Sequence, residues 1–160
     1  MGLPISFYGF LREVNSRFIP AMNGVYCVYA CTNNWWDNTV SIRKLIYIGE
    51  SSDVRKRIQG HERKADWRRH LLFGEELCYN VAFVHPYVRL QVEAALIHYH
   101  CPPENTEYVY AFPFEQISLT LSGRFAFLSP DFTVFREPYS PLLSALWGYQ
   151  GRDSYGIRWY

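Results

Sequence analysis

Two segments decide the fold of this chain: Gly24-Val25-Tyr26-Cys27-Val28-Tyr29-Ala30-Cys31 and Leu45-Ile46-Tyr47-Ile48-Gly49. Both are rich in β-branched and aromatic residues, which favour buried β-strands. Between them lies the cluster Thr32-Asn33-Asn34-Trp35-Trp36-Asp37-Asn38, whose polar residues favour a break in the strand. We therefore predict an antiparallel pair of strands joined by a long loop.

The next segment predicts a helix and a third strand. Ser51-Ser52-Asp53 offers side-chain oxygens that cap exposed backbone N–H groups, so we expect a helix to begin there. This helix either ends near Gly60 or continues through His70. A strand is expected over residues 77–84, because a β-rich run there stops before a proline.

A second helix is expected over residues 87–100, where apolar residues recur at helical spacing. Cys101-Pro102-Pro103 ends it, because proline lacks an N–H and disfavours a helical residue before it. Residues 5–20 also show loose helical spacing of apolar side chains, which predicts an opening helix.

The composition changes after Asn105. Short β-like runs are separated by proline, glycine and serine, and a short helix is expected over residues 142–147. The β-like runs cover residues 108–114, 116–121, 124–128 and 132–135. We predict an α/β fold with a small three-stranded, mainly antiparallel sheet flanked by helices. Its parts are an N-terminal helical segment (1–22), a core (23–105) and a β-rich aromatic extension (106–160).

Composition limits the class of protein. The chain has 160 residues, 49% of them hydrophobic and 18% aromatic, which fits one folded domain and excludes disorder for most of it. No run of about 18 apolar residues is present, so we expect no membrane-spanning segment and no membrane partner. Four cysteines without tight pairing and an N-terminus without a secretion signal predict a cytoplasmic protein.

Charge is unevenly distributed, although the net charge is only +1. Nine basic and four acidic residues lie between Arg43 and Arg69. Such a segment attracts an anionic partner such as nucleic acid, or it forms an ordinary solvated helix face. If the helix continues past Gly60, Arg57, His61, Lys64 and Arg68 fall along one stripe, which would face phosphates.

Six elements follow one another in an order that matters for function: Gly24-Val25-Tyr26, Tyr47-Ile48-Gly49, Arg57, His61, Glu93 and Asn105. This ordered set resembles the GIY-YIG nuclease family over residues 23–105. The family pattern has a GIY-like triplet, a YIG-like triplet, a helix bearing arginine and often histidine, a helical glutamate and a downstream asparagine. Val25 replaces the isoleucine of the first triplet, a β-branched exchange that preserves strand geometry.

These residue types suit phosphodiester hydrolysis by themselves. Glu93 is a hard oxygen ligand, and Mg²⁺ commonly binds through one carboxylate while keeping water and phosphate ligands. Arg57 presents a planar, permanently charged fork to a phosphate. The two tyrosines are candidates to position or deprotonate water, and a base role needs a nearby cation because free tyrosine has a pKa of about 10.

The resemblance implies a role for each residue. Tyr26 would be the general base, Tyr47 would help to orient water, Arg57 would contact the scissile phosphate and His61 would carry a proton or contact the leaving group. Glu93 would hold the metal, Mg²⁺ or Mn²⁺, and Asn105 would fix local geometry by hydrogen bonding. Gly24 and Gly49 would let the backbone come close to neighbouring groups at the substrate site, where a side chain would collide. Independently of the resemblance, Lys64 and Arg68 of the basic stripe are expected as further substrate contacts.

We therefore expect a divalent-metal-dependent endonuclease that hydrolyses DNA, of a phage or restriction type, with a homodimer as one expected assembly and RNA left open as a substrate. The alternatives are a non-catalytic nucleic-acid-binding module and a partner-binding subunit with a nuclease-like fold. Each residue also has a structural interpretation, with the tyrosines packing in strands and Glu93 solvated on its helix. Trp35 and Trp36 either pack against the C-terminal tail or a second subunit, the favoured interpretation, or wedge between or stack on bases.

Overall fold

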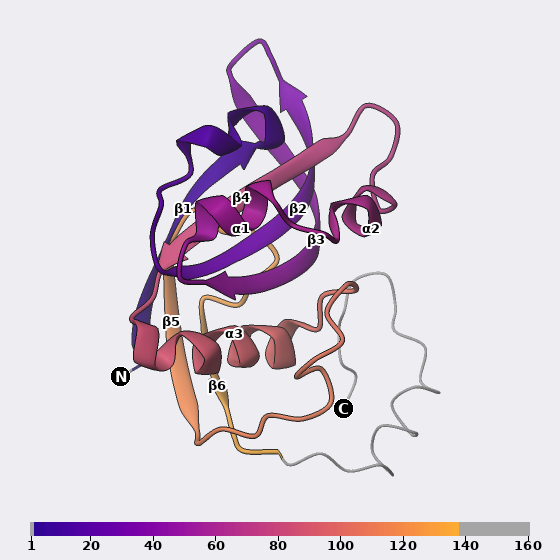
Figure 1. Cartoon of the computed structure of the whole chain (residues 1–160). Coiled ribbons are helices and arrows are strands. Elements are labelled where there is room, and N and C mark those ends of the chain that lie inside the picture. The colour runs from indigo at the N-terminus through magenta and orange to yellow at the C-terminus, as the bar shows by residue number, and fades with distance from the viewer. Residues whose placement is uncertain (1, 138–160) are drawn as a thin grey trace.

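The computed structural model describes residues 2–137 (Figure 1). Within this range six strands form one sheet in the order β3-β2-β4-β1-β5-β6. All neighbouring strands are antiparallel except β1 and β5, which are parallel. The elements are β1 (Leu3–Arg12), the 3₁₀ helix η1 (Glu13–Phe18), β2 (Gly24–Asn34), β3 (Thr39–Ser51), α1 (Val54–Gln59), α2 (Lys64–Arg68), β4 (Glu76–Phe83), α3 (Pro86–His100), β5 (Ile117–Gly123) and β6 (Asp131–Val134).

The sheet curls around α3. This helix contacts β2 and β3 at one end of the sheet and β5 and β6 at the other (Figure 1). Its second half is therefore buried on nearly all sides, from Val92 to His98 except Glu93. The opposite face of β2 and β4 is covered by α1, α2 and η1, with Trp67 at the centre of that core. Because β2 is buried on both faces, residues 24–31 form a continuous run of buried side chains.

The expected three-stranded sheet flanked by helices was wrong. The antiparallel strands β3, β2 and β4 form only half of the sheet, and the segments before and after them add three more strands. The helix expected over residues 5–20, in the N-terminal segment 1–22, is strand β1 followed by η1. Along β1, Ile5 and Phe7 are buried while Ser6 and Tyr8 are exposed, so the period is two residues.

The antiparallel pair of β2 and β3 is confirmed, but the long loop between them was wrong. The ladder continues from Gly24 opposite Ser51 to Asn34 opposite Thr39, which leaves only residues 35–38 in the turn. The polar residues expected to break the strand instead close the hairpin, since the Asn34 side chain donates to the hydroxyl groups of Thr39 and Ser41.

The helix expected after Ser51 begins as predicted and then stops. Asp53 caps α1 by accepting a hydrogen bond from the backbone N–H of Lys56. The helix ends at Gln59, with Gly60 as its C-cap, and α2 begins only at Lys64. Continuation through His70 was therefore wrong, and so was the single helical stripe proposed for the four basic positions.

The strand over residues 77–84 and the helix over residues 87–100 are confirmed as β4 and α3. Of the four later β-like runs, two form β5 and β6, whereas residues 108–114 and 124–128 are not strands. The helix expected at residues 142–147 lies outside the described residues. Strand β1 pairs with both β4 and β5, so parts of the predicted segments 1–22, 23–105 and 106–160 share one sheet. None of the helices in the described range has the length and apolarity needed to cross a bilayer.

Candidate active site

A polar cleft of about 420 Å³ lies where β2 begins and β3 ends. Four of the residues expected from the sequence line it: Tyr26 of β2, Tyr47 of β3, Arg57 of α1 and Glu93 of α3. The rest of its wall is Glu50, Ser51, Ser52, Arg89, Leu90 and Glu107. Four separate elements thus bring two phenols, a guanidinium and a carboxyl group to one space.

The two glycines of the triplets make room for backbone and ring packing. A Cβ atom built on Gly49 would lie 2.5 Å from the hydroxyl oxygen of Tyr26 and 2.8 Å from the ring of Tyr47. At Gly24 it would lie 2.0 Å from the carbonyl oxygen of Ala82 on β4. The expected close approach is therefore present at both positions. Gly49 shapes the tyrosine side of the cleft, whereas Gly24 allows strand packing and does not line the cleft.

Arg57 and Tyr26 interact at the cleft wall. The guanidinium of Arg57 donates to both carboxylate oxygens of Glu62, at 2.8 and 3.0 Å, and also hydrogen-bonds the Tyr26 side chain. Burial raises the pKa of Tyr26 above its usual value, and Tyr47 adds to this rise while Arg57 opposes it. Burial also raises the pKa of Tyr47. Both phenols are therefore neutral at physiological pH and keep a proton to donate.

Glu93 has an unusual carboxyl group. Burial raises its pKa to about 8, and the nearby Glu50 and Glu107 add to the rise. Arg89 opposes it, although Arg89 is itself paired with the carboxylate of Glu50. Glu93 is one helical turn after Arg89, so both side chains extend from the same side of α3 into the cleft.

The oxygen donors of the cleft fit a hard divalent cation, although the described residues do not supply a complete set of protein ligands. Among the described residues, no group of three or more His, Cys, Asp or Glu side chains is arranged to ligate a metal. Mg²⁺ is, however, usually held by one or two carboxylates together with water and substrate phosphate. Glu93 offers such a carboxylate, and a cation beside it would favour the ionised form against the burial and the repulsion from Glu50 and Glu107 that raise its pKa.

His61 lies behind the tyrosines rather than in the cleft. Its ring centroid is 4.3 Å from that of Trp67 and 5.5 Å from that of Tyr47, and its Nδ1 accepts from the backbone N–H of Arg63. Burial, with a smaller contribution from Arg57, lowers the pKa of His61 to about 4. The imidazole is thus neutral at physiological pH, and its packing supports the position of the Tyr47 ring.

Asn105 holds the outer edge of β3. Its amide oxygen accepts from the backbone N–H of Ile48 at 2.9 Å, and its amide nitrogen donates to the carbonyl of Ile48 at 2.8 Å. The backbone N–H of Glu104 also donates to the carbonyl of Ile46. The segment after α3 therefore takes the place of a neighbouring strand and fixes the triplet that carries Tyr47.

Lys64 and Arg68 point elsewhere. Both are paired with Glu13 of η1, at 3.2 and 2.7 Å, and neither lines the cleft. Their positions follow from the break at Gly60, which turns α2 away from the direction of α1.

No protein-family model, no curated protein and no solved structure matches this chain. The interpretation of the cleft therefore depends on its own residues.

Several cleft residues were not among the expected ones. Glu50, Ser51 and Ser52 directly follow the second triplet, so their position beside Tyr47 could have been inferred from the strand. Arg89 lies four residues before Glu93, which is helical spacing. Glu107 lies in an irregular segment, and no pattern in the sequence pointed to it.

Proposed function

We propose that the chain is a divalent-metal-dependent endonuclease that hydrolyses DNA phosphodiester bonds at the cleft. The observation that carries this proposal is the meeting of Tyr26, Tyr47, Arg57 and Glu93, from four elements, around one polar space. These residues are separated by up to 67 positions in the sequence, so their meeting is a property of the fold. The resemblance of the ordered motifs to GIY-YIG nucleases supports the same reaction.

Arg57 is the phosphate-binding group in this proposal. Its guanidinium is partly exposed and is held in place by Glu62. A preorganised cation beside a phosphate stabilises the negative charge that grows in the transition state. Because the pKa of both tyrosines is raised, Tyr26 and Tyr47 act first as hydrogen-bonding groups that orient the attacking water. Deprotonation of Tyr26 requires an additional positive charge nearby.

Glu93 is the metal-binding group. A divalent cation bound there would supply positive charge beside the phosphate oxygens. The carboxyl group must lose its proton to act as a ligand, and its pKa of about 8 makes this step pH-dependent. Arg89, paired with Glu50, and Asn105, bonded to Ile48, keep the surrounding backbone and side chains in place.

The decisive experiment is cleavage of supercoiled plasmid by the full chain. With Mg²⁺ or Mn²⁺ we expect nicked or linear product, and with EDTA we expect none. Glu93→Gln should abolish cleavage and leave the fold intact, whereas Glu115→Gln, at an exposed carboxylate that does not line the cleft, should retain it. Retained metal-dependent cleavage in Glu93→Gln, or cleavage in EDTA, would overturn the metal site.

Arg57→Ala tests the phosphate-binding role. Loss of one preorganised electrostatic donor typically lowers the rate on the order of 10²–10³-fold, and we expect a decrease of this size. Lys56→Ala is the matched control, because it removes the same charge from the adjacent, exposed position of α1. Equal rates for the two variants would show that charge on α1, rather than the Arg57 fork, supports cleavage.

A further inference from the structure

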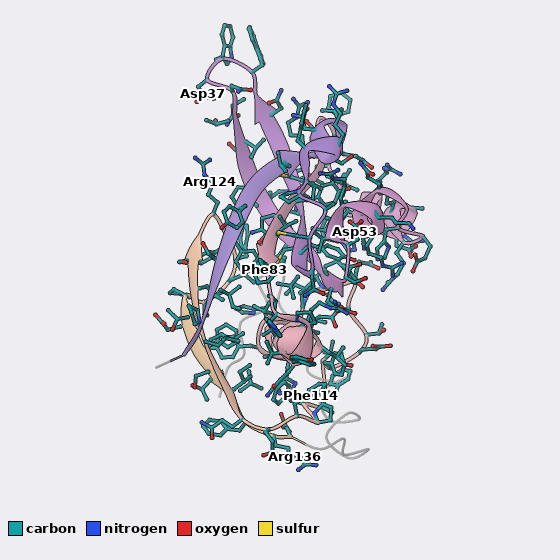
Figure 2. All side chains as sticks on the ribbon, turned by 60° about the vertical axis from the view of Figure 1, so that its left-hand side comes forward. Asp37, Asp53, Phe83, Phe114, Arg124 and Arg136 are labelled. Atoms are coloured by element: carbon teal, nitrogen blue, oxygen red, sulfur yellow. The ribbon has the colours of Figure 1, made fainter. Side chains whose placement is uncertain are left out.

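The tip of the β2–β3 hairpin exposes two aromatic rings. Trp35 and Trp36 are 67% and 82% exposed, and their rings stack on each other with centroids 3.5 Å apart. Figure 2 shows the tip, marked by Asp37, projecting away from the rest of the molecule. Each indole covers only one face of the other, so the second face of each ring is free of its stacking partner. The two rings lie at the end of the hairpin farthest from the cleft.

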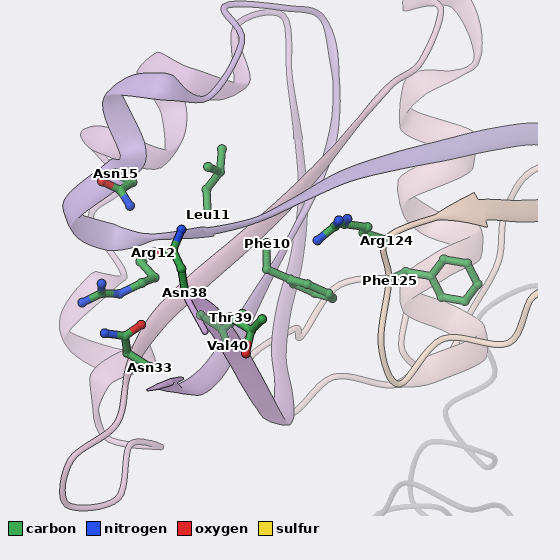
Figure 3. Close-up of a pocket in the computed structure, with 10 residues that line it drawn as sticks. All are labelled: Phe10, Leu11, Arg12, Asn15, Asn33, Asn38, Thr39, Val40, Arg124 and Phe125. Carbon is green, nitrogen blue, oxygen red and sulfur yellow. The ribbon is translucent and has the colours of Figure 1, made fainter. Parts of the chain in front are cut away.

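A second pocket, of about 570 Å³, lies beside this tip (Figure 3). Figure 3 shows Arg12, Asn33 and Asn38 on one side and Arg124 and Phe125 on the other. The remaining lining residues are Phe10, Leu11, Asn15, Thr39 and Val40. The pocket therefore combines strands β1, β2 and β3 with the segment that follows β5, and it is separate from the cleft.

Four of the polar side chains that line this pocket are available to a ligand. Within residues 2–137, no hydrogen bond or ion pair engages the guanidinium of Arg124 or the side-chain amides of Asn15, Asn33 and Asn38. Arg12, by contrast, donates to Glu76 at 2.6 Å. Among the described residues that line the pocket, none is acidic.

Asp37, the acidic residue of the tip, is already engaged. Its carboxylate accepts from both the backbone N–H and the hydroxyl of Thr39.

This combination of groups matches a polynucleotide with unpaired bases. Indole rings stack on any base, amide groups pair with the hydrogen-bonding edges of bases, and arginine binds phosphate. In a duplex the faces of the bases are covered by stacking and their pairing edges are occupied. Exposed rings and free amides together therefore favour a single strand, a flap or a splayed end over a continuous duplex.

We infer that the hairpin tip and its pocket form a second nucleic-acid contact, which binds an unpaired strand through Trp35, Trp36 and Arg124. The inference rests on the proposed function in taking a polynucleotide as the ligand, and it adds the class of substrate. Tyr26 and Asn33 are seven residues apart on β2, which corresponds to about 23 Å at about 3.3 Å per residue. Changes at the tip therefore leave the cleft intact.

The test measures binding in EDTA, so that it does not depend on cleavage. The full chain is titrated into labelled oligonucleotides of about 20 nucleotides, longer than typical single-strand sites, as single-stranded DNA, single-stranded RNA and blunt DNA duplex. We expect tighter binding of the single strands than of the duplex, and quenching of tryptophan fluorescence. The doubly substituted W35A/W36A chain should bind single strands roughly 10-fold or more weakly, and Arg124→Ala should also weaken binding.

Phe73→Ala is the matched control, because Phe73 is a fully exposed aromatic residue that lines neither pocket. Unchanged affinity of W35A/W36A for single strands, or equal affinity of the natural chain for duplex and single strand, would overturn the inference. It would also be overturned if W35A/W36A kept its single-strand binding and instead lost self-association of the chain. If plasmid is not cut but W35A/W36A loses single-strand binding, the proposed hydrolysis fails and this contact stands. If plasmid is cut and W35A/W36A binds single strands normally, the proposed hydrolysis stands and this contact fails.

Discussion

The cleft and the hairpin-tip pocket lie at opposite ends of β2 and β3, and their polar groups are held differently. In the cleft, Arg57 is fixed by Glu62, and burial raises the pKa of Glu93. In the pocket, the guanidinium of Arg124 and the side-chain amide of Asn33 make no hydrogen bond or ion pair with another described residue. Preorganised, partly desolvated groups suit chemistry on a fixed phosphate, whereas free amides and rings suit adaptable binding. Substitutions should therefore affect stability and cleavage at one end, and only binding at the other.

The largest effect is expected at Glu93. Its raised folded-state pKa means that its contribution to stability is fully present below pH 4.5 and is lost as the pH rises through about 8. Gln cannot ionise, so at pH 8 the Glu93→Gln variant should have a higher free energy of unfolding than the natural chain. The gain should be on the order of a few kcal/mol, because one pKa unit corresponds to about 1.4 kcal/mol.

Urea unfolding of both chains at pH 5 and pH 8 measures this difference. An identical pH dependence in Glu93→Gln and the natural chain would contradict a buried carboxyl group at this position. A variant that is stabilised at pH 8 and yet inactive in plasmid cleavage would show that the cleft gives up stability for chemistry.

The next effect compares two asparagines. Asn105→Ala removes both hydrogen bonds to Ile48 and leaves a buried N–H and C=O without partners, which should cost about 2–4 kcal/mol of unfolding free energy. Asn33→Ala, at the pocket, should change stability by less than about 0.5 kcal/mol. Chemical unfolding of the two variants measures the contrast. Similar losses in both would mean that the tip is held as tightly as the cleft.

A smaller effect is expected from two glycines. Gly49→Ala places a methyl group against the rings of Tyr26 and Tyr47, and overpacking of this kind typically costs about 1–3 kcal/mol. Gly60→Ala meets only the carbonyl of Lys56, at an ordinary 3.5 Å, and should be tolerated. Thermal unfolding and plasmid cleavage of both variants test this. Normal cleavage by Gly49→Ala would show that the tyrosines need not pack against the triplet glycine.

The sequence predicted the strands and helices that carry the cleft, because their signals are local. The apolar runs of β2 and β3, the Asp53 cap and the proline stop after α3 each mark their own element. Strand β1 was missed because its apolar residues also fit a loose helical period. Its alternation becomes evident only when burial between β4 and β5 is known. Pairing between residues 3–7 and 119–123 depends on long-range contacts, which local patterns do not encode.

The site residues likewise divide into those that the sequence placed correctly and those whose positions depend on long-range contacts. Tyr26, Tyr47, Arg57 and Glu93 were predicted to meet because an ordered motif links them, and they do line one cleft. Lys64 and Arg68 were placed on the same stripe by assuming a continuous helix. Because the helix breaks at Gly60, both side chains form ion pairs with Glu13. No local sequence pattern predicts these pairs.

The smallest effect is expected for pH at the hairpin-tip pocket. Guanidinium, amide and indole groups neither gain nor lose a proton between about pH 5 and 8, and hydrogen bonds from Thr39 lower the pKa of Asp37 further from this range. Single-strand binding in EDTA should therefore stay constant over these values. Plasmid cleavage should instead decrease as the pH falls, because Glu93, with its pKa of about 8, becomes protonated. Binding that strengthens on acidification would show that a titrating group outside this set contributes to the contact.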